Sequence, residues 1–86
     1  MDFLQLRAEI DRIDDKLISL FKQRMAIVEQ VANYKKAQNL PTLDANREQE
    51  KIWHLASQLP SELTQYATPL YQTLFEISRH YQQQLK

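Results

Sequence analysis

From Phe3 to Leu40 the chain carries an apolar residue every three or four positions and contains no glycine or proline. This spacing is the period of an α-helix, so the pattern predicts one helix over nearly all of this range. At about 1.5 Å per residue the helix would be roughly 50 Å long, more than a compact domain of this size can bury. We therefore expect a second copy of the chain to cover part of it. The apolar positions are Leu6, Ile10, Ile13, Leu17, Leu20, Phe21, Val28 and Val31.

Two proline-containing breaks divide the rest of the chain into two shorter helices. Pro41 disfavours helical geometry at the residue before it, and Asp44 can then cap a helix that runs to about Leu59. Pro60 marks a turn, after which the helical period returns and continues to the C-terminus, although Pro69 leaves the start of this last helix open. No strand alternation or internal repeat is present. The pattern predicts an all-α fold with one very long N-terminal helix and two shorter ones, intertwined with a second chain as a homodimer.

Length and composition narrow the class of protein. With 86 residues, the chain is expected to be a single domain, residues 1–86, whose own core is small. The 11 basic and 11 acidic residues balance, which disfavours a nucleic-acid partner. The absence of cysteine and glycine excludes thiolate metal sites, cysteine nucleophiles and glycine-rich phosphate loops. The sequence has neither a signal-peptide pattern nor a long apolar stretch, so we expect no membrane association and a cytoplasmic location.

Two cations interrupt the apolar stripe of the long helix. On a helical wheel of about 100° per residue, with Leu6 at zero, Arg24 falls at about 0° and Lys35 at about 20°. A solvated face does not account for cations at these positions. Arg7 lies at about 100°, on the edge of the stripe, where it can reach solvent or a partner chain.

The second helix also directs polar groups toward its apolar face. With Ile52 at zero, Glu48 lies at about −40°, among the apolar residues. Asp44 lies nearby at about −80°, whereas Arg47 falls well off this face.

The last helix places a hydroxyl and an amide one turn apart. With Leu74 at zero, Ser78 falls near 40°, within the apolar stripe, and Gln82 near 80°, on its rim. All three predicted helices therefore point polar side chains inward.

Each of these residues, taken alone, has a structural explanation. Arg24 or Lys35 can pair with Glu48. Asp44 can merely cap its helix, and Ser78 can bond back to its own helix. Taken together, so many desolvated polar groups would be a costly structural device in so small a protein. A pocket for a small polyanion is the better joint explanation.

The two histidines indicate neither a metal site nor a catalytic triad. Glu50 with His54 and Glu76 with His80 are each four residues apart, whereas ferritin-like helical metal sites use a spacing of three. Both histidines fall outside the apolar stripes, so we expect them at the surface. We therefore expect no metal site.

The inward polar residues belong to short segments spread over nearly the whole chain. These segments are residues 6–11, 13–14 and 24–26, Lys35 with Thr42 seven positions later, residues 44–48, and Ser78 with Gln82. In order and spacing they resemble the all-helical chorismate mutases.

The resemblance implies an isomerase that converts chorismate to prephenate by a Claisen rearrangement, at the branch toward phenylalanine and tyrosine. It implies a homodimer with two equivalent, shared active sites and no cofactor. Arg24 and the partner subunit's Arg7 would bind the two carboxylates of chorismate. Lys35 and Gln82 would donate to its ether oxygen, and Glu48 would accept from its ring hydroxyl. The implied substrate-binding residues are Arg7, Arg24, Lys35, Asp44, Arg47, Glu48, Ser78 and Gln82, of which Lys35, Gln82 and Arg24 are the catalytic ones.

Helix geometry independently favours a shared site. Arg7 and Arg24 are 17 residues apart in the sequence. That is about 25 Å along one helix, so both cannot contact one substrate of under roughly 10 Å. A second, antiparallel chain can bring its own Arg7 to the pocket.

Two other functions stay open. Isochorismate-pyruvate lyase is a related enzyme on the same scaffold and looks similar at the arginine, lysine and glutamine positions, but Ser78 and residues 44–48 match the mutases better. A helical dimerisation module, whose inward charges only fix the register of its helices, belongs to a different class. Such a module would not respond to a chorismate-like dianion.

Overall fold

The chain consists of three helices, and the computed structural model describes residues 1–85. The helices are α1 (Phe3–Ala37), α2 (Ala45–Ala56) and α3 (Ala67–Gln84), and a 3-10 turn, η1 (Thr64–Tyr66), leads into α3. The described residues form no strand, and α1 alone is 35 residues long. The predicted all-α fold with one very long N-terminal helix is confirmed.

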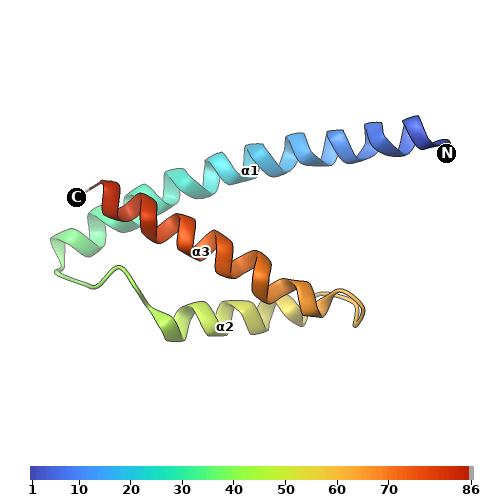
Figure 1. Ribbon diagram of the computed structural model, residues 1–86. Coiled ribbons are helices and arrows are strands. Elements are labelled where there is room, and N and C mark those ends of the chain that lie inside the picture. Colours follow the sequence, from blue (N-terminus) through green and yellow to red (C-terminus); the bar gives the residue numbers. More distant parts are fainter. Residues whose placement is uncertain (86) are drawn as a thin grey trace.

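α1 begins at Phe3 because the residues around its first turn satisfy its free backbone groups. Asp2 Oδ1 accepts a hydrogen bond from the Gln5 N–H, and Gln5 Oε1 accepts one from the Asp2 N–H, both at 2.8 Å. This reciprocal arrangement is a capping box. A well-defined start suits a helix whose N-terminal end projects beyond the other helices of its own chain (Figure 1).

α1 ends at Ala37, slightly before the predicted limit near Leu40. Asn39 adopts a left-handed conformation with φ of 55°, which asparagine tolerates better than most residues. The Leu40 N–H then donates to the Lys35 carbonyl at 2.8 Å, as in a Schellman motif. The helix thus ends before Leu40, the residue at which Pro41 disfavours helical geometry.

α2 starts where predicted and ends three residues earlier than predicted. Asp44 caps it, accepting from the Arg47 N–H at 3.1 Å. Beyond Ala56 the backbone tightens, and the Leu59 N–H donates three residues back to the Ala56 carbonyl at 3.1 Å. Because Leu59 precedes Pro60, helical geometry is disfavoured there, which explains the earlier end.

α3 accommodates Pro69 in its first turn. The N–H groups of the first turn have no partner within a helix, so a proline there removes no hydrogen bond. The start of α3 at Ala67 settles the boundary that the sequence left open.

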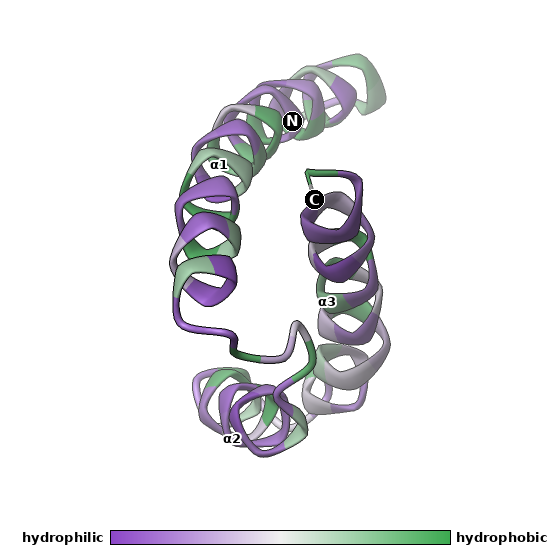
Figure 2. Ribbon diagram, turned by 90° about the vertical axis from the view of Figure 1, so that its left-hand side faces the viewer, coloured by the Kyte–Doolittle hydropathy of each residue, from purple (hydrophilic) through white to green (hydrophobic). Residues whose placement is uncertain are grey.

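α3 packs against both α1 and α2, and the end-on view shows α1 and α3 at the left and right with α2 below them (Figure 2). The N-terminal half of α1 diverges from α3, and its first turns project beyond the other helices (Figure 1). The chain measures 54 × 26 × 15 Å, and its radius of gyration is 16.0 Å. A compact chain of this length would have a radius of gyration of about 12 Å. No helix among residues 1–85 has the length and apolar character needed to cross a membrane.

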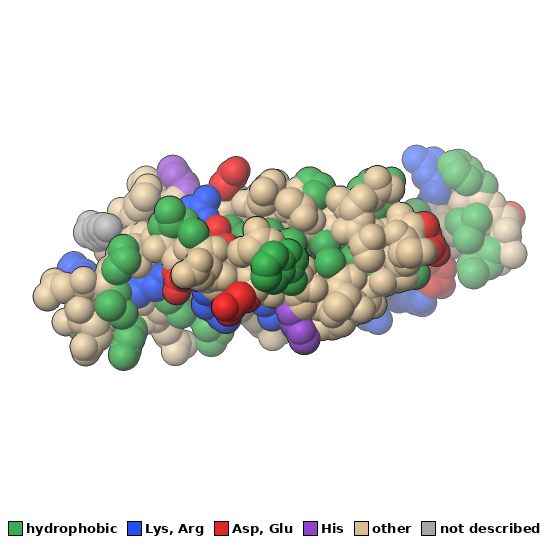
Figure 3. Space-filling model, turned by 90° about the horizontal axis from the view of Figure 1, so that it is seen from below, with side chains coloured by type: hydrophobic (Ala, Val, Ile, Leu, Met, Phe, Trp, Pro, Cys, Tyr) green, Lys and Arg blue, Asp and Glu red, His purple; other side chains and the backbone are tan. Residues whose placement is uncertain are grey.

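The apolar core of one chain is small, and α1 contributes only one buried residue to it. The buried apolar residues are Val28, Ile52, Ala67 and Phe75. In contrast, the apolar stripe on the first half of α1 is between 47% and 58% exposed at Leu6, Ile10, Ile13, Leu17 and Leu20. Figure 3 shows hydrophobic side chains on the surface, including the projecting end at the right.

α3 buries a face that is rotated from the predicted one. Ser78 and Gln82 are only 6% and 7% exposed, whereas the apolar Leu70 and Ile77 are 58% and 39% exposed. The apolar period correctly predicted a helix, but the side of α3 that faces α1 is the partly polar one. α3 therefore has both a partly polar inner face and an uncovered apolar face.

Candidate active site

A cavity of about 510 Å³ lies between the second half of α1, the N-terminal part of α2 and the part of α3 from Tyr71 to Gln82. A volume of this size suits a small-molecule ligand. Seven of the eight residues that the sequence marked as binding residues line it. They are Arg24, Lys35, Asp44, Arg47, Glu48, Ser78 and Gln82.

Arg24 and Ser78 join α1 to α3 on one wall of this cavity. The Arg24 guanidinium donates to Ser78 Oγ at 2.5 Å, and this hydroxyl in turn donates to the Leu74 carbonyl at 2.8 Å. Ser78 thus bonds back to its own helix, as the structural alternative expected, and also orients Arg24. Since a hydroxyl is neutral, it leaves the charge of the guanidinium uncompensated.

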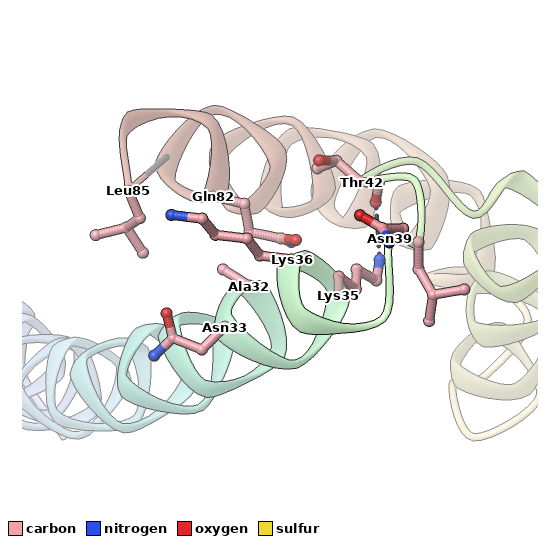
Figure 4. A pocket seen from close by; sticks show the side chains of 9 residues that line it. Ala32, Asn33, Lys35, Lys36, Asn39, Thr42, Gln82 and Leu85 are labelled. Carbon is pink, nitrogen blue, oxygen red and sulfur yellow. Dashed lines mark hydrogen bonds between the residues drawn. The ribbon is translucent and has the colours of Figure 1, made fainter.

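Lys35 and Gln82 lie at the end of the cavity where α1 and α3 terminate. Lys35 Nζ donates to the Thr42 carbonyl at 2.8 Å, which ties the connection before α2 to α1 (Figure 4). An ammonium has three hydrogens, so two remain for a ligand. Gln82 lines the same end, and its burial limits the orientations of its amide.

α2 contributes two carboxylates and an arginine. Asp44 caps the helix and also lines the cavity. Arg47 lines the cavity although its backbone position lies off the apolar face of α2, because an arginine side chain is long enough to reach around a helix. Glu48 is half-buried, and its Oε2 accepts from Arg79 Nη1 at 2.5 Å.

The pairing of Glu48 with Arg79 differs from the expected structural alternative. Among the described residues, neither Arg24 nor Lys35 forms an ion pair. The suggested pairing of either cation with Glu48 is therefore wrong.

Sequence reasoning missed two cations of the cavity, Arg79 on α3 and Lys51 on α2. Arg79 lies at about 140° from Leu74 on the helical wheel, far from the apolar stripe, so the period gave no signal for it. Lys51 follows Glu48 by three positions and thus shares its helix face, which is the one signal that could have indicated it.

The cavity is strongly cationic in a chain that is neutral overall. Five cationic side chains and two carboxylates line it, a formal excess of three positive charges, while the whole chain has a net charge of zero. Apolar residues complete the wall, among them Tyr71 and Phe75. Their rings pack edge to face, with the ring centroids 5.8 Å apart. Low-polarity walls strengthen the attraction between these cations and an anion.

Arg7 is the one predicted site residue that does not line the cavity. It lies near the N-terminal end of α1, and its guanidinium stacks over the Phe3 ring at 5.0 Å from the ring centroid. Its position agrees with the expectation that it cannot reach the site of its own chain.

The histidines contribute nothing to this cavity. His54 and His80 are both exposed. Within residues 1–85 no three His, Asp or Glu side chains gather in a way that would hold a metal ion.

The fold and the cavity together define an all-helical protein with a cationic pocket. The sequence matches the family described as chorismate mutase type II over residues 6–83, and the chain belongs to this family. No curated protein and no solved structure matches the chain significantly.

Proposed function

We propose that the protein is a homodimeric chorismate mutase that isomerises chorismate to prephenate with no cofactor or metal. The observation that carries this proposal is the cationic cavity, lined by seven polar residues that the family resemblance marks for substrate binding. Residues 1–86 would form a single mutase domain. The reaction would serve phenylalanine and tyrosine synthesis in the cytoplasm.

Chorismate is a dianion, which fits an excess of positive charge. Arg24, held by Ser78, would bind one carboxylate. The partner subunit's Arg7 would bind the other. Asp44 and Arg47 would complete the pocket with polar contacts to the ring hydroxyl and a carboxylate. Such anchoring holds the enolpyruvyl side chain over the ring. The enzyme would thereby bind chorismate in the reactive conformation, which is rare in solution.

The rearrangement breaks an ether C–O bond while a C–C bond forms, so no proton is transferred and no nucleophile is required. Negative charge grows on the ether oxygen as the bond breaks. Lys35 and Gln82 at the end of the cavity would donate hydrogen bonds to this oxygen, which stabilises the transition state more than the bound substrate. Glu48 would accept from the ring hydroxyl.

A dimer is supported by the apolar stripe that one chain leaves uncovered on α1. This stripe extends over the first half of a 35-residue helix, and α3 adds exposed Leu70 and Ile77. Contiguous apolar surface of this kind is typical of an interface between subunits. A second copy of the chain would cover it and would carry its own Arg7 toward the cavity.

Incubation of the purified protein with chorismate tests the proposed function. We expect chorismate to disappear and prephenate to be the product, identified by chromatography and by its acid-catalysed conversion to phenylpyruvate. Release of pyruvate from isochorismate, without prephenate from chorismate, would identify the lyase instead. If neither substrate reacts, the dimerisation module is the better description.

A further inference from the structure

The ion pair between Arg79 and Glu48 joins α3 to α2 inside the cavity, across 31 positions of sequence. Arg79 Nη1 lies 2.5 Å from Glu48 Oε2, and the two side chains are 26% and 24% exposed. Both residues line the cavity. A charge-assisted hydrogen bond in such a half-buried place restricts both side chains more than a pair in free solvent does.

We propose that Arg79 is a positioning residue that holds the Glu48 carboxylate away from Arg24 and Lys35, so that these two cations stay available to the substrate. This inference rests on the mutase function proposed above. Arg79 occupies Oε2 of Glu48, which leaves Oε1 as the acceptor for the ring hydroxyl.

The contacts of the other two cations support this role. Arg24 donates to a neutral hydroxyl and Lys35 to a neutral backbone carbonyl, so neither has its charge neutralised in the described part of the chain. Without Arg79, the half-buried carboxylate of Glu48 would lose its partner, and it would turn toward another cation of the cavity, of which Arg24 and Lys35 are two. An internal carboxylate bound there competes with the carboxylate of the substrate.

Arg79→Met tests this competition. We expect KM for chorismate to rise about tenfold, the effect of losing one hydrogen bond to a charged group, while kcat changes much less. Arg79→Lys, which retains the charge but not the planar donor geometry, should recover part of the loss. Arg12→Met is the matched control, because Arg12 pairs with Glu9 on the exposed surface of α1. We expect this control to leave both constants unchanged.

The Glu48→Gln background separates positioning from a direct or merely structural role. Glutamine has no charge with which to capture Arg24 or Lys35, so adding Arg79→Met to Glu48→Gln should not raise KM further. An equal tenfold rise in both backgrounds would overturn the proposal, as would an unchanged KM in the single variant. The proposal would also be overturned if Arg79→Met lowered both kcat and the melting temperature and Arg79→Lys recovered neither.

The wild-type protein in the same assays separates this inference from the proposed function. If the wild type does not convert chorismate, the mutase function itself fails. If the wild type is active and the KM pattern is absent, only the role of Arg79 fails. If Arg79→Met does not fold at the assay temperature, Arg79→Gln replaces it with the same expectations, since it removes the charge and retains a polar side chain.

Discussion

Lys35→Ala is expected to lower kcat/KM about a hundredfold or more, comparable to deleting one donor of an oxyanion hole. A hundredfold loss corresponds to about 2.7 kcal/mol of transition-state stabilisation. The loss should include kcat, because the ammonium would interact more strongly as negative charge grows on the ether oxygen. Steady-state kinetics of prephenate formation measure both constants.

Lys22→Ala is the control for this variant, since it removes the same charge from the same helix, and Lys22 is exposed and does not line the cavity. Lys35 also holds the connection before α2 through the Thr42 carbonyl, so thermal unfolding of both variants should accompany the kinetics. An unaltered kcat with a raised KM in Lys35→Ala would assign Lys35 to uniform substrate binding and contradict its proposed role.

Arg24→Met is expected to abolish mutase activity while the melting temperature stays the same or rises. The empty cavity has an excess of positive charge, and methionine removes part of this repulsion while filling the same apolar stripe. Ser78 is not left unpaired by the change, because its hydroxyl still donates to the Leu74 carbonyl. Activity and thermal unfolding should therefore respond independently.

Ligand stabilisation sharpens this test. A bicyclic dicarboxylate that resembles the transition state should raise the melting temperature of the wild type and of a Lys22→Met control, because a ligand that binds only the folded state stabilises it. Lys22 is an exposed cation on the same helix. Arg24→Met should show no such rise. A large fall in the melting temperature of Arg24→Met, with no ligand effect on the wild type, would instead show that Arg24 stabilises the fold.

The helices and several polar residues of the cavity could be predicted, because both follow from the period of single helices. Arg24 and Ser78 lie at inward positions of their own apolar stripes, and the structure brings them within 2.5 Å of each other. The boundaries were less accurate, since the end of α1 depends on a left-handed Asn39 rather than on Pro41.

The other contacts of the cavity depend on how the helices pack against one another. A helical wheel describes one helix and gives no information about this packing. The ion pair between Arg79 and Glu48 requires a particular rotation of α3 against α2, and this rotation also exposes Leu70 and Ile77. Arg47 shows a different limit, because a wheel gives the direction of a Cβ atom and not the reach of a long side chain.

Mixed dimers test most directly whether each active site is built from two chains. Arg7→Ala and Lys35→Ala should each be dimeric in sedimentation experiments. Each should be nearly inactive in kinetic assays. In a mixed dimer one of the two sites carries neither substitution, so random exchange should restore about a quarter of wild-type prephenate formation. No recovery, with mixed dimers demonstrated by differently tagged chains, would show that Arg7 does not complete the site of its partner.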